Sequence, residues 1–278
     1  IGDVLKSQEG IYDVNQSNAG LFVSIPFCPT RCAYCSFISS EIAKEKNVDS
    51  YVDCLVLEIE NSLKLLKNPR SIYVGGGTPV ALDGKNLTKV LKALSPISNR
   101  VKEFTVEAGR PDAITSENLQ ILKDYNVTRI CVNPQTFSNK TLQIIGRKHT
   151  AQSVIDKFYL AKSFGFEVNM DVIAGLPEET FLDFKNTIDT VIKLNPENFT
   201  VHTLCLKKGS TLKRQCSRLY VEEISKMLDY AKEKLFNNEY LPYYLYRQKN
   251  MSGNLENVGY AKSGYESPYN IYMMERII

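Results

Sequence analysis

The chain of 278 residues is long enough for one large α/β domain with a substantial core, or for one domain with an appendage. Its 34 Lys and Arg residues are interspersed with 31 Asp and Glu residues, which gives a formal net charge of +3 and no basic stripe. This balance argues against a nucleic-acid partner and favours a small-molecule ligand. No apolar run approaches the roughly 18 residues that a membrane helix needs, and no charged-then-apolar leader opens the chain, so we expect no membrane span and a cytoplasmic location.

From residue 21 onward, β-branched apolar runs alternate with longer amphipathic segments, which predicts repeated β–α units and a parallel sheet. The expected strands cover residues 21–25, 71–75, 103–108, 129–133, 167–173 and 198–203. The expected helices, with apolar residues every three or four positions, cover residues 51–66, 117–125, 153–164, 181–194 and 219–236. We expect Ser116 and Asp183 in first turns or caps, and Gly84 and Gly165 at helix ends.

Cysteine, glycine and polar residues gather just after, or at the end of, the expected strands. In strand order these are three cysteines, the GGGTP run at 75–79, Glu107, Asn133 with Gln135, Asp171 and His202. In barrels of parallel strands, the chemistry gathers at the C-terminal rim. Six units rather than eight therefore predict an α/β fold, an open partial (β/α)6 TIM-like barrel with a C-terminal extension and its site at that rim.

Three of the seven cysteines, Cys28, Cys32 and Cys35, lie within eight residues. Thiolates at this density favour an iron–sulfur cluster, zinc or copper over hard cations. A four-iron cluster held by three cysteines leaves one iron open to chelate the amino and carboxylate groups of a small molecule. Zinc is the minor alternative because it needs a fourth ligand, and neither His149 nor His202 lies nearby in sequence. Three unrelated thiols are the other alternative.

The C-x-x-x-C-x-x-C spacing, with Tyr34 before the last cysteine, resembles the signature of the radical SAM superfamily. The resemblance implies a fold of radical SAM type, a [4Fe-4S] cluster on Cys28, Cys32 and Cys35, and S-adenosylmethionine (SAM) on the open iron. Further runs resemble the oxygen-independent coproporphyrinogen III oxidase (dehydrogenase) family, in its clostridial and bacillar variant. These runs are SIPFCPTRCAYC, YVGGGTP, VEAGRPD, NPQTF, IGRKHT, NMDVIAGLP and YRQKNMSGNLENVGYAKSGYE.

This resemblance implies a radical SAM oxidoreductase of haem biosynthesis that decarboxylates propionates of coproporphyrinogen III to vinyl groups, giving protoporphyrinogen IX. It also implies one or two bound SAM molecules, a tetrapyrrole substrate, and an electron donor such as flavodoxin or ferredoxin. The well-studied branch of the family has tyrosine in place of Phe22 and a further cysteine in place of Phe37. A sister group that traffics haem also lacks that cysteine, so the alternative is a haem-binding protein without decarboxylase activity.

By motif position, the resemblance implies SAM contacts at Phe22, Tyr34, Gly76, Gly77, Thr78, Glu107, Gln135, Arg147, Asp171, Ile173 and Cys205. Glycines admit a ligand close to the backbone, and Ile173 offers an apolar wall for adenine. Simpler interpretations stay open for each residue. The GGGTP run is also a tight turn closed by Pro79, and a rim charge such as Glu107 or Arg147 is, on its own, more often part of a salt bridge.

We expect three parts: an N-terminal extension at 1–20, a radical SAM barrel at 21–205 and a substrate-covering extension at 206–278, with truncation at both ends. The last part combines many tyrosines with Arg247 and Lys249. A tetrapyrrole is a flat apolar ring edged by carboxylates, so aromatic faces and cations suit it. Arg247 is the preferred contact because its guanidinium grips a carboxylate through two bonds. The alternative is a tyrosine-rich edge strand with solvated cations.

Overall fold

The computed structural model describes residues 2–11, 19–35, 37, 40–205, 210–212, 221–247 and 255–274. These residues form one eight-stranded sheet of order β1-β4-β5-β6-β7-β8-β10-β9. Its strands are β1 (Ala19–Ile25), β4 (Pro69–Gly76), β5 (Glu103–Gly109), β6 (Arg129–Val132), β7 (Glu167–Ala174), β8 (Asn198–Thr203), β9 (Leu241–Tyr246) and β10 (Asn257–Ala261). A separate short pair, β2 (Phe27–Cys28) and β3 (Ser40–Glu41), follows β1.

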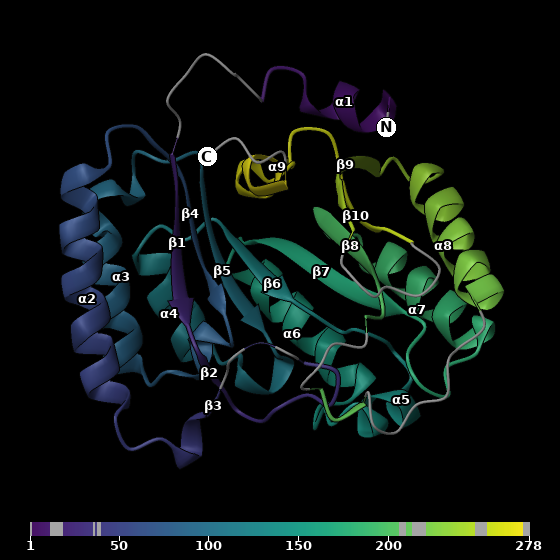
Figure 1. Ribbon diagram of the computed structural model, residues 1–278, viewed down its shortest axis with the longest axis horizontal. Helices are drawn as coiled ribbons and strands as arrows, with labels where there is room; N and C mark the ends of the chain where they lie inside the picture. The colour runs from purple at the N-terminus through teal and green to yellow at the C-terminus, as the bar shows by residue number, and fades with distance from the viewer. Residues whose placement is uncertain are drawn as a thin grey trace.

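The neighbouring strands from β1 to β8 are parallel, whereas β10 is antiparallel to β8 and β9 is antiparallel to β10. The sheet curls into a half-barrel whose convex side is covered by helices (Figure 1). The six predicted parallel strands and the open barrel are therefore confirmed. The predicted C-terminal extension contributes a hairpin that continues the same sheet, while the boundaries at residues 20 and 205 stay predictions.

The longer helices pack on the convex side, and the short helices lie at its two ends. The helices are α1 (Gly2–Gln8), α2 (Val48–Leu65), α3 (Gly84–Ser98), α4 (Ser116–Asp124), α5 (Asn139–Ile144), α6 (Ala151–Ser163), α7 (Phe181–Leu194), α8 (Val221–Phe236) and α9 (Pro268–Met274). Single 3-10 turns are η1 (Ile42–Lys44), η2 (Pro79–Ala81) and η3 (Pro111–Ala113). None of the helices that the structure describes has the length and apolar content to cross a membrane.

Helix starts follow side-chain caps. Thr180 accepts a hydrogen bond from the N–H of Asp183, whose side chain bonds back to the Thr180 N–H, so Asp183 lies in the first turn of α7 as predicted. Ser116 likewise begins α4, behind the cap Thr115. The prediction for Gly84 was wrong, because Gly84 begins α3 behind the cap Asp83.

Helix α3 was also missing from the predicted helices. Its buried residues include Leu87, Val90, Leu91 and Leu94, at helical spacing. Pro96, two residues before α3 ends at Ser98, lacks the N–H that would bond to the Lys92 carbonyl, and the Ser95 hydroxyl donates to that carbonyl instead, at 2.8 Å. A glycine at one end and a proline near the other thus concealed an amphipathic pattern that the sequence contains.

Alternation along the strands divides the apolar core from the inner surface of the half-barrel. On β1, Val23 and Ile25 are buried in the core under the helices, while Phe22 and Ser24 are exposed on the other face. The same period places Tyr73, Glu107 and the polar residues of β7 on the inner face. The inner face is therefore lined with polar and aromatic side chains.

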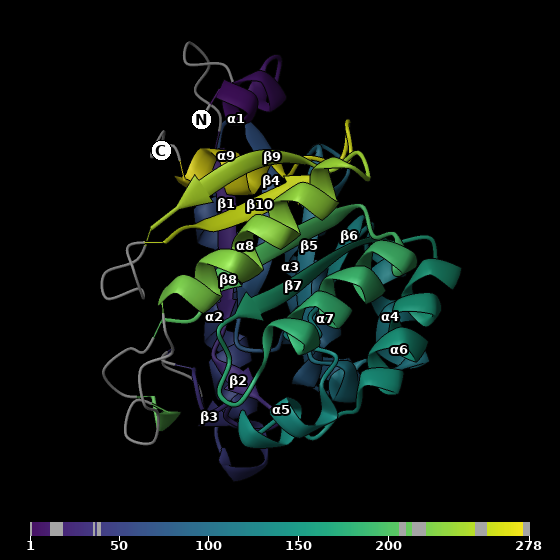
Figure 2. The ribbon, with the colours of Figure 1, turned by 90° about the vertical axis from the view of Figure 1, so that its right-hand side faces the viewer.

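The two ends of the half-barrel are built from different segments. Figures 1 and 2 show α1 and α9 together at the end where the parallel strands begin, which we call the floor, and β2, β3 and α5 at the opposite end, the rim. At the floor, Glu103 accepts hydrogen bonds from Arg129 (3.1 Å), from the Ser267 hydroxyl (2.7 Å) and from the Tyr269 N–H (3.0 Å). The buried Glu103 and Arg129 side chains thus fasten the C-terminal segment to the strand starts.

Candidate cluster and cofactor site

The cysteine loop leaves the end of β1 and is held there by the GGGTP loop that follows β4. The Gly77 N–H donates to the Ile25 carbonyl at 2.8 Å, and the Thr78 N–H donates to the Phe27 carbonyl at 2.7 Å. A Cβ on Gly77 would lie 2.5 Å from the Phe27 carbonyl oxygen, so only glycine permits this approach. The need for glycine at this position comes from the chain's own backbone, as in the tight-turn alternative.

Glu107, at the end of β5, lies against the same loop. Its Oε2 accepts from the Gly76 N–H at 3.0 Å, and its Oε1 accepts from the Tyr73 hydroxyl at 2.8 Å. Burial raises the pKa of the Glu107 carboxyl to about 7 despite the Tyr73 hydrogen bond, and the charge of Asp171 adds to the rise. Glu107 therefore changes protonation near neutral pH, and the SAM contacts predicted for the glycines stay predictions.

Two of the three clustered thiols receive side-chain hydrogen bonds. Thr78 Oγ1 donates to Cys28 Sγ at 3.6 Å, and Arg110 Nη1 donates to Cys32 Sγ at 3.5 Å. The N–H of the third, Cys35, donates to the Cys32 carbonyl at 3.1 Å. Burial raises the pKa of the Cys35 thiol. The thiolate is the form that binds metals, and these donors can bond to it.

The donor set fits a four-iron cluster better than a single ion. All three thiols are free and partly exposed. Within the described ranges, no three His, Cys, Asp or Glu side chains converge as a single metal ion requires. A cluster takes its cysteines on separate irons, so its ligands need not converge on one point.

Asp171, on the inner face of β7, is held by amides from two strands. Asn133 Nδ2 donates to Oδ2 and Asn169 Nδ2 donates to Oδ1, each at 2.8 Å. His202 Nε2 lies 3.8 Å from Oδ2. Burial alone would raise the pKa of the Asp171 carboxyl, but His202 and the amide of Asn169 hold it below its ordinary value. Asp171 is therefore an ionised acceptor at the rim.

Gln135 and Ile173 are brought beside Asp171 by a local backbone pairing. The Gln135 N–H donates to the Asp171 carbonyl and the Ile173 N–H donates to the Gln135 carbonyl, each at 3.0 Å. Gln135 adopts a left-handed backbone with φ of 65°. Its buried side-chain Oε1 has no hydrogen-bond partner among the described residues, so it is an acceptor available to a ligand.

Arg147 connects the cysteine loop to this group. Its Nη2 donates to the Tyr34 hydroxyl at 3.0 Å and its Nη1 donates to the Asn133 carbonyl at 3.0 Å. Tyr34 packs against the apolar cluster that contains Ile173, and burial raises its pKa. Arg147 Nε is buried without a partner in the described part of the chain. Arg147 bonds to Tyr34 and backbone carbonyls, whereas Glu107 bonds to Tyr73 and Gly76, so these predicted SAM contacts do not use each other as partners.

Phe22, on β1, and Cys205, after β8, are the other two predicted contacts. Phe22 is 48% exposed on the inner face, with its ring centroid 6.2 Å from those of Tyr73 and Tyr269. Cys205 follows β8 and is partly exposed. Phe22 therefore belongs to an aromatic wall on the β1 side of the half-barrel.

A second aromatic wall comes from β9, the predicted tyrosine-rich segment. The Tyr244 ring covers Gly259, where a Cβ would lie 1.8 Å from the ring. Tyr246 stacks on Tyr244 at 6.3 Å, and its hydroxyl lies 3.4 Å from His202 Nδ1. His202, for which a core histidine was the simpler interpretation, thus joins the second wall to Asp171.

Of the two predicted substrate cations, the structure describes Arg247 but not Lys249. Arg247 is exposed and directs Nε and Nη2 to Glu256 Oε1, at 3.1 and 2.8 Å. Lys249 lies outside the described residues. Arg247 must therefore leave Glu256 to hold a ligand carboxylate through two bonds.

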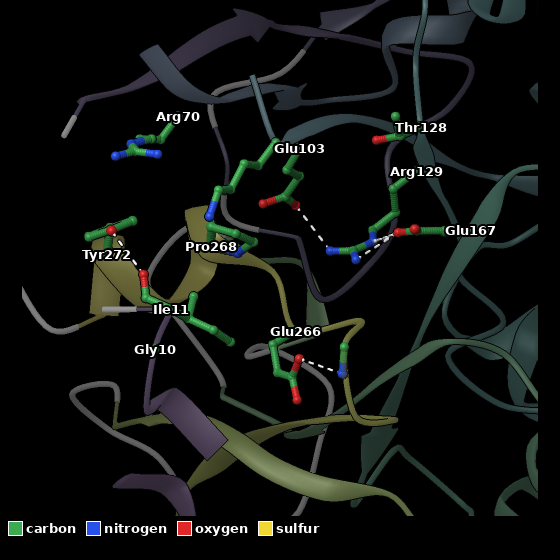
Figure 3. A pocket seen from close by; sticks show the side chains of 12 residues that line it. Gly10, Ile11, Arg70, Glu103, Thr128, Arg129, Glu167, Glu266, Pro268 and Tyr272 are labelled. Carbon is green, nitrogen blue, oxygen red and sulfur yellow. Dashed lines mark hydrogen bonds and ion pairs between the residues drawn. The ribbon is translucent and has the colours of Figure 1, made fainter. Parts of the chain in front are cut away.

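A cavity of about 360 Å³ lies at the floor, at the other end of the strands from the cysteines (Figure 3). Figure 3 shows Arg129 joined to Glu103 and to Glu167 along its wall. Because the buried Arg129 already pairs with both carboxylates, we assign the candidate site to the rim.

Sequence reasoning placed most rim residues but missed three that organise them. Asn169 lies two positions before Asp171 on β7, and Tyr73 lies two positions before Gly75, the first residue of the GGGTP run, so strand alternation was the available signal. Arg110 directly follows β5 in the run AGRPD, which the strand-end rule also covers. The contacts of Tyr73 with Glu107 and of Arg110 with Cys32 join distant segments, so sequence spacing could not reveal them.

Comparisons with known proteins identify relatives of the chain. The family model "Radical SAM superfamily" matches residues 22–191. The chain is 40% identical over 275 residues to the oxygen-independent coproporphyrinogen-III oxidase-like protein HemZ of Bacillus subtilis, which covers 94% of this chain and 55% of that protein. It is 30% identical over 261 residues to the heme chaperone HemW of the same organism, covering 90% and 65%.

Among solved structures, coproporphyrinogen III oxidase (HemN) from Escherichia coli superposes with a TM-score of 0.74 at 20% identity, covering 98% of this chain and 60% of that one. The chain thus spans between about half and two thirds of the length of these relatives. Taken with the three-cysteine rim, these matches show that the chain belongs to the radical SAM superfamily, in its coproporphyrinogen III oxidase-like family.

Proposed function

We propose that this chain is the catalytic core of a radical SAM oxidoreductase that decarboxylates propionate side chains of coproporphyrinogen III. Superfamily membership implies a [4Fe-4S] cluster and SAM. One observation carries the proposal: the cysteine loop is bonded, through Gly77 and through Tyr34 to Arg147, to the rim that presents Glu107, Gln135 and Asp171. Relatives named as a coproporphyrinogen oxidase and an oxidase-like protein support the substrate class.

In this proposal Cys28, Cys32 and Cys35 hold the cluster. Bound there, the cluster and SAM would supply hydrogen-abstracting radical chemistry, with one electron from a donor such as flavodoxin or ferredoxin; a propionate that gives up a hydrogen atom would release CO2 and pass one electron to a one-electron acceptor, which leaves a vinyl group. The second propionate is treated in the same way, by the same SAM site or with a second SAM.

The chain's own residues bind and orient. Asp171 is ionised and accepts hydroxyl donors, and the unpaired Gln135 Oε1 accepts one more. Phe22, Tyr34, Gly76, Gly77, Thr78 and Cys205 complete the proposed SAM contacts. Arg147 fixes Tyr34 of the cysteine loop against Ile173, which excludes water from one side of the site.

The substrate in this proposal lies between the two aromatic walls, on the inner face of the half-barrel. Tyr73 and Tyr269 stack at 4.4 Å beside Phe22, and Tyr244 and Tyr246 stack on the opposite side. Stacked rings suit a flat macrocycle. Arg247 and Lys249 then hold propionates at its edge.

The second candidate function is haem trafficking without decarboxylation. It is favoured by 30% identity to a heme chaperone and by Phe37 in place of the further cysteine. The same aromatic walls suit haem, so the walls do not separate the two candidates.

The test uses the full-length protein, reconstituted anaerobically with iron and sulfide, then supplied with SAM, a reductant and coproporphyrinogen III. Release of CO2 with protoporphyrinogen supports decarboxylation. Stoichiometric haem binding without CO2 release supports trafficking and overturns the first proposal. Alanine at Cys28, Cys32 or Cys35 should abolish iron uptake of about four per chain, while Cys54→Ala, at an exposed cysteine on α2, should not. Full iron in all three site variants would contradict the cluster assignment.

A further inference from the structure

Arg110 is a buried cation whose position the proposed function does not explain. It directly follows Gly109, which has a φ of +51°, so the chain turns sharply at the end of β5. Only 3% of Arg110 is exposed. From this turn the guanidinium reaches the cysteine loop, where Nη1 donates to the Thr30 carbonyl at 3.1 Å and to Cys32 Sγ at 3.5 Å.

Asp112 fixes the direction of this guanidinium. Arg110 Nε donates to Asp112 Oδ1 at 3.0 Å and Nη2 donates to Oδ2 at 2.9 Å, the two-bond geometry that arginine forms with a carboxylate. The Asp112 side chain is 26% exposed, whereas that of Arg110 is 4% exposed. Asp112 therefore aims the remaining donors at the cysteine loop and offsets part of the positive charge.

The three cysteines differ in this respect. Cys28 receives a neutral hydroxyl donor from Thr78 at 3.6 Å, whereas Cys32 receives a charged donor. Hydrogen bonds to sulfur and the local net charge set the reduction potential of an iron–sulfur cluster. A cation held away from water acts on a nearby charge more strongly than one in solvent. A positive group beside the sulfur favours the reduced cluster, because the reduced cluster carries one more electron.

We propose that Arg110 is a positioning residue that holds Cys32 and raises the reduction potential of the cluster, and that Asp112 moderates this effect. The inference rests on the proposed function, because it requires the cluster. It predicts opposite effects at two residues in direct contact, which a purely structural role does not.

The experiment is an anaerobic titration of the reconstituted full-length protein with dithionite, followed by electron paramagnetic resonance. Dithionite gives one electron to the cluster, which passes from the 2+ to the 1+ state, and no covalent bond forms or breaks. Arg110→Gln should lower the equilibrium constant for reduction by about tenfold, or 59 mV for one electron. Arg110→Lys, which keeps the charge, should lie between that variant and the native protein. Asp112→Asn, which keeps an acceptor for Arg110 but removes the negative charge, should raise the potential.

Arg31→Gln is the matched control, because Arg31 lies between Cys28 and Cys32 but is exposed, and it should shift the potential less than Arg110→Gln. Iron content and thermal melting are measured for every variant. Unchanged potentials with full iron in both Arg110 variants, or shifts of the same sign for Arg110→Gln and Asp112→Asn, would overturn the inference. Loss of iron from both Arg110 variants at native stability would reduce Arg110 to a structural support. If the native protein takes up no iron, the proposed function itself fails.

Discussion

The floor and the rim of this half-barrel differ in the hydrogen-bond partners of their buried polar groups. At the floor, Glu103 and Arg129 bond to each other, and Glu103 also accepts from Thr105, Ser267 and the Tyr269 N–H. At the rim, the buried Gln135 Oε1 and Arg147 Nε have no partners among the described residues. The parallel strands thus begin beside a buried ion pair and end beside Gln135 Oε1 and Arg147 Nε, although Ser71 Oγ and Asn198 Oδ1 near the strand starts are also unpaired among the described residues.

The difference separates stability from binding. Buried polar groups are nearly always paired in folded proteins, so each unpaired one needs an explanation, and a bound ligand is the explanation proposed for those at the rim. Substitutions at the floor are therefore expected to alter unfolding, and substitutions at the rim to alter ligand binding.

Glu103→Ala should give the largest effect, because it leaves Arg129 and three further donors at the floor without their shared acceptor. We expect a loss of about 3–5 kcal/mol in the free energy of unfolding, measured by urea denaturation. Glu60→Ala, at an exposed position of α2, is the control and should stay within about 0.5 kcal/mol. A loss below 1 kcal/mol for Glu103→Ala would break the comparison at the floor.

The pH dependence of the free energy of unfolding tests the rim at Glu107. Its pKa is raised from 4.5 to about 7, so the folded state holds a proton that the unfolded state loses between these values, and stability should fall as pH rises through that window. Above pH 7 the loss is complete and at most about 3 kcal/mol. Glu107→Gln should flatten this part of the curve of unfolding free energy against pH.

Glu179 provides the comparison for that curve, because burial raises its pKa to about 8 at a site that faces Thr136 and Asp183. Glu179→Gln should reduce the slope over the wider window from pH 4.5 to about 8, and the part between pH 7 and 8 should depend on Glu179 alone. An unchanged slope below pH 7 in Glu107→Gln would show that Glu107 titrates normally.

Gln135→Met should affect binding and stability in opposite directions. Replacing an unpaired buried amide by an apolar side chain of similar length is neutral or stabilising, by up to about 1 kcal/mol. The same change removes the acceptor proposed for SAM, so the dissociation constant measured by anaerobic calorimetry should rise about tenfold, or 1.4 kcal/mol. Unchanged SAM affinity in Gln135→Met would show that Gln135 has only a structural role.

Whether a feature of the fold or of the site could be predicted from the sequence depends on whether it rests on local signals or on contacts between distant segments. The six strands and the rim positions of Glu107, Gln135 and Asp171 followed from periodicity and strand ends, which are local signals. The motif spacing likewise identified the cysteine loop. Helix α3 carried the same local signal, which Gly84 at its start and Pro96 near its end concealed.

What sequence could not give was the pairing between distant segments. Nothing local indicates that Gly77 needs glycine because the Phe27 carbonyl lies beneath it, or that Arg110 reaches Cys32. Such contacts join strands that are neighbours only in the folded sheet. The guanidinium of Arg247, expected to be free for a ligand, likewise bonds to Glu256, which lies just before β10.

Arg247 should give the smallest effect on stability and tests whether the rim extends to the β9 side. Its pair with Glu256 is exposed, so Arg247→Lys should change the free energy of unfolding by less than about 1 kcal/mol. Lysine cannot reproduce the two-bond grip on a carboxylate, so affinity for coproporphyrinogen or haem should fall while the cluster and SAM cleavage by strong reductants persist. Glu256→Gln is the matched control: it loosens the native pair and frees the guanidinium, and tetrapyrrole affinity should then rise. If neither variant nor Arg247→Ala changes tetrapyrrole binding, measured by absorbance titration, the guanidinium serves only to join β9 to the segment before β10, and the substrate lies closer to His202 and the aromatic walls.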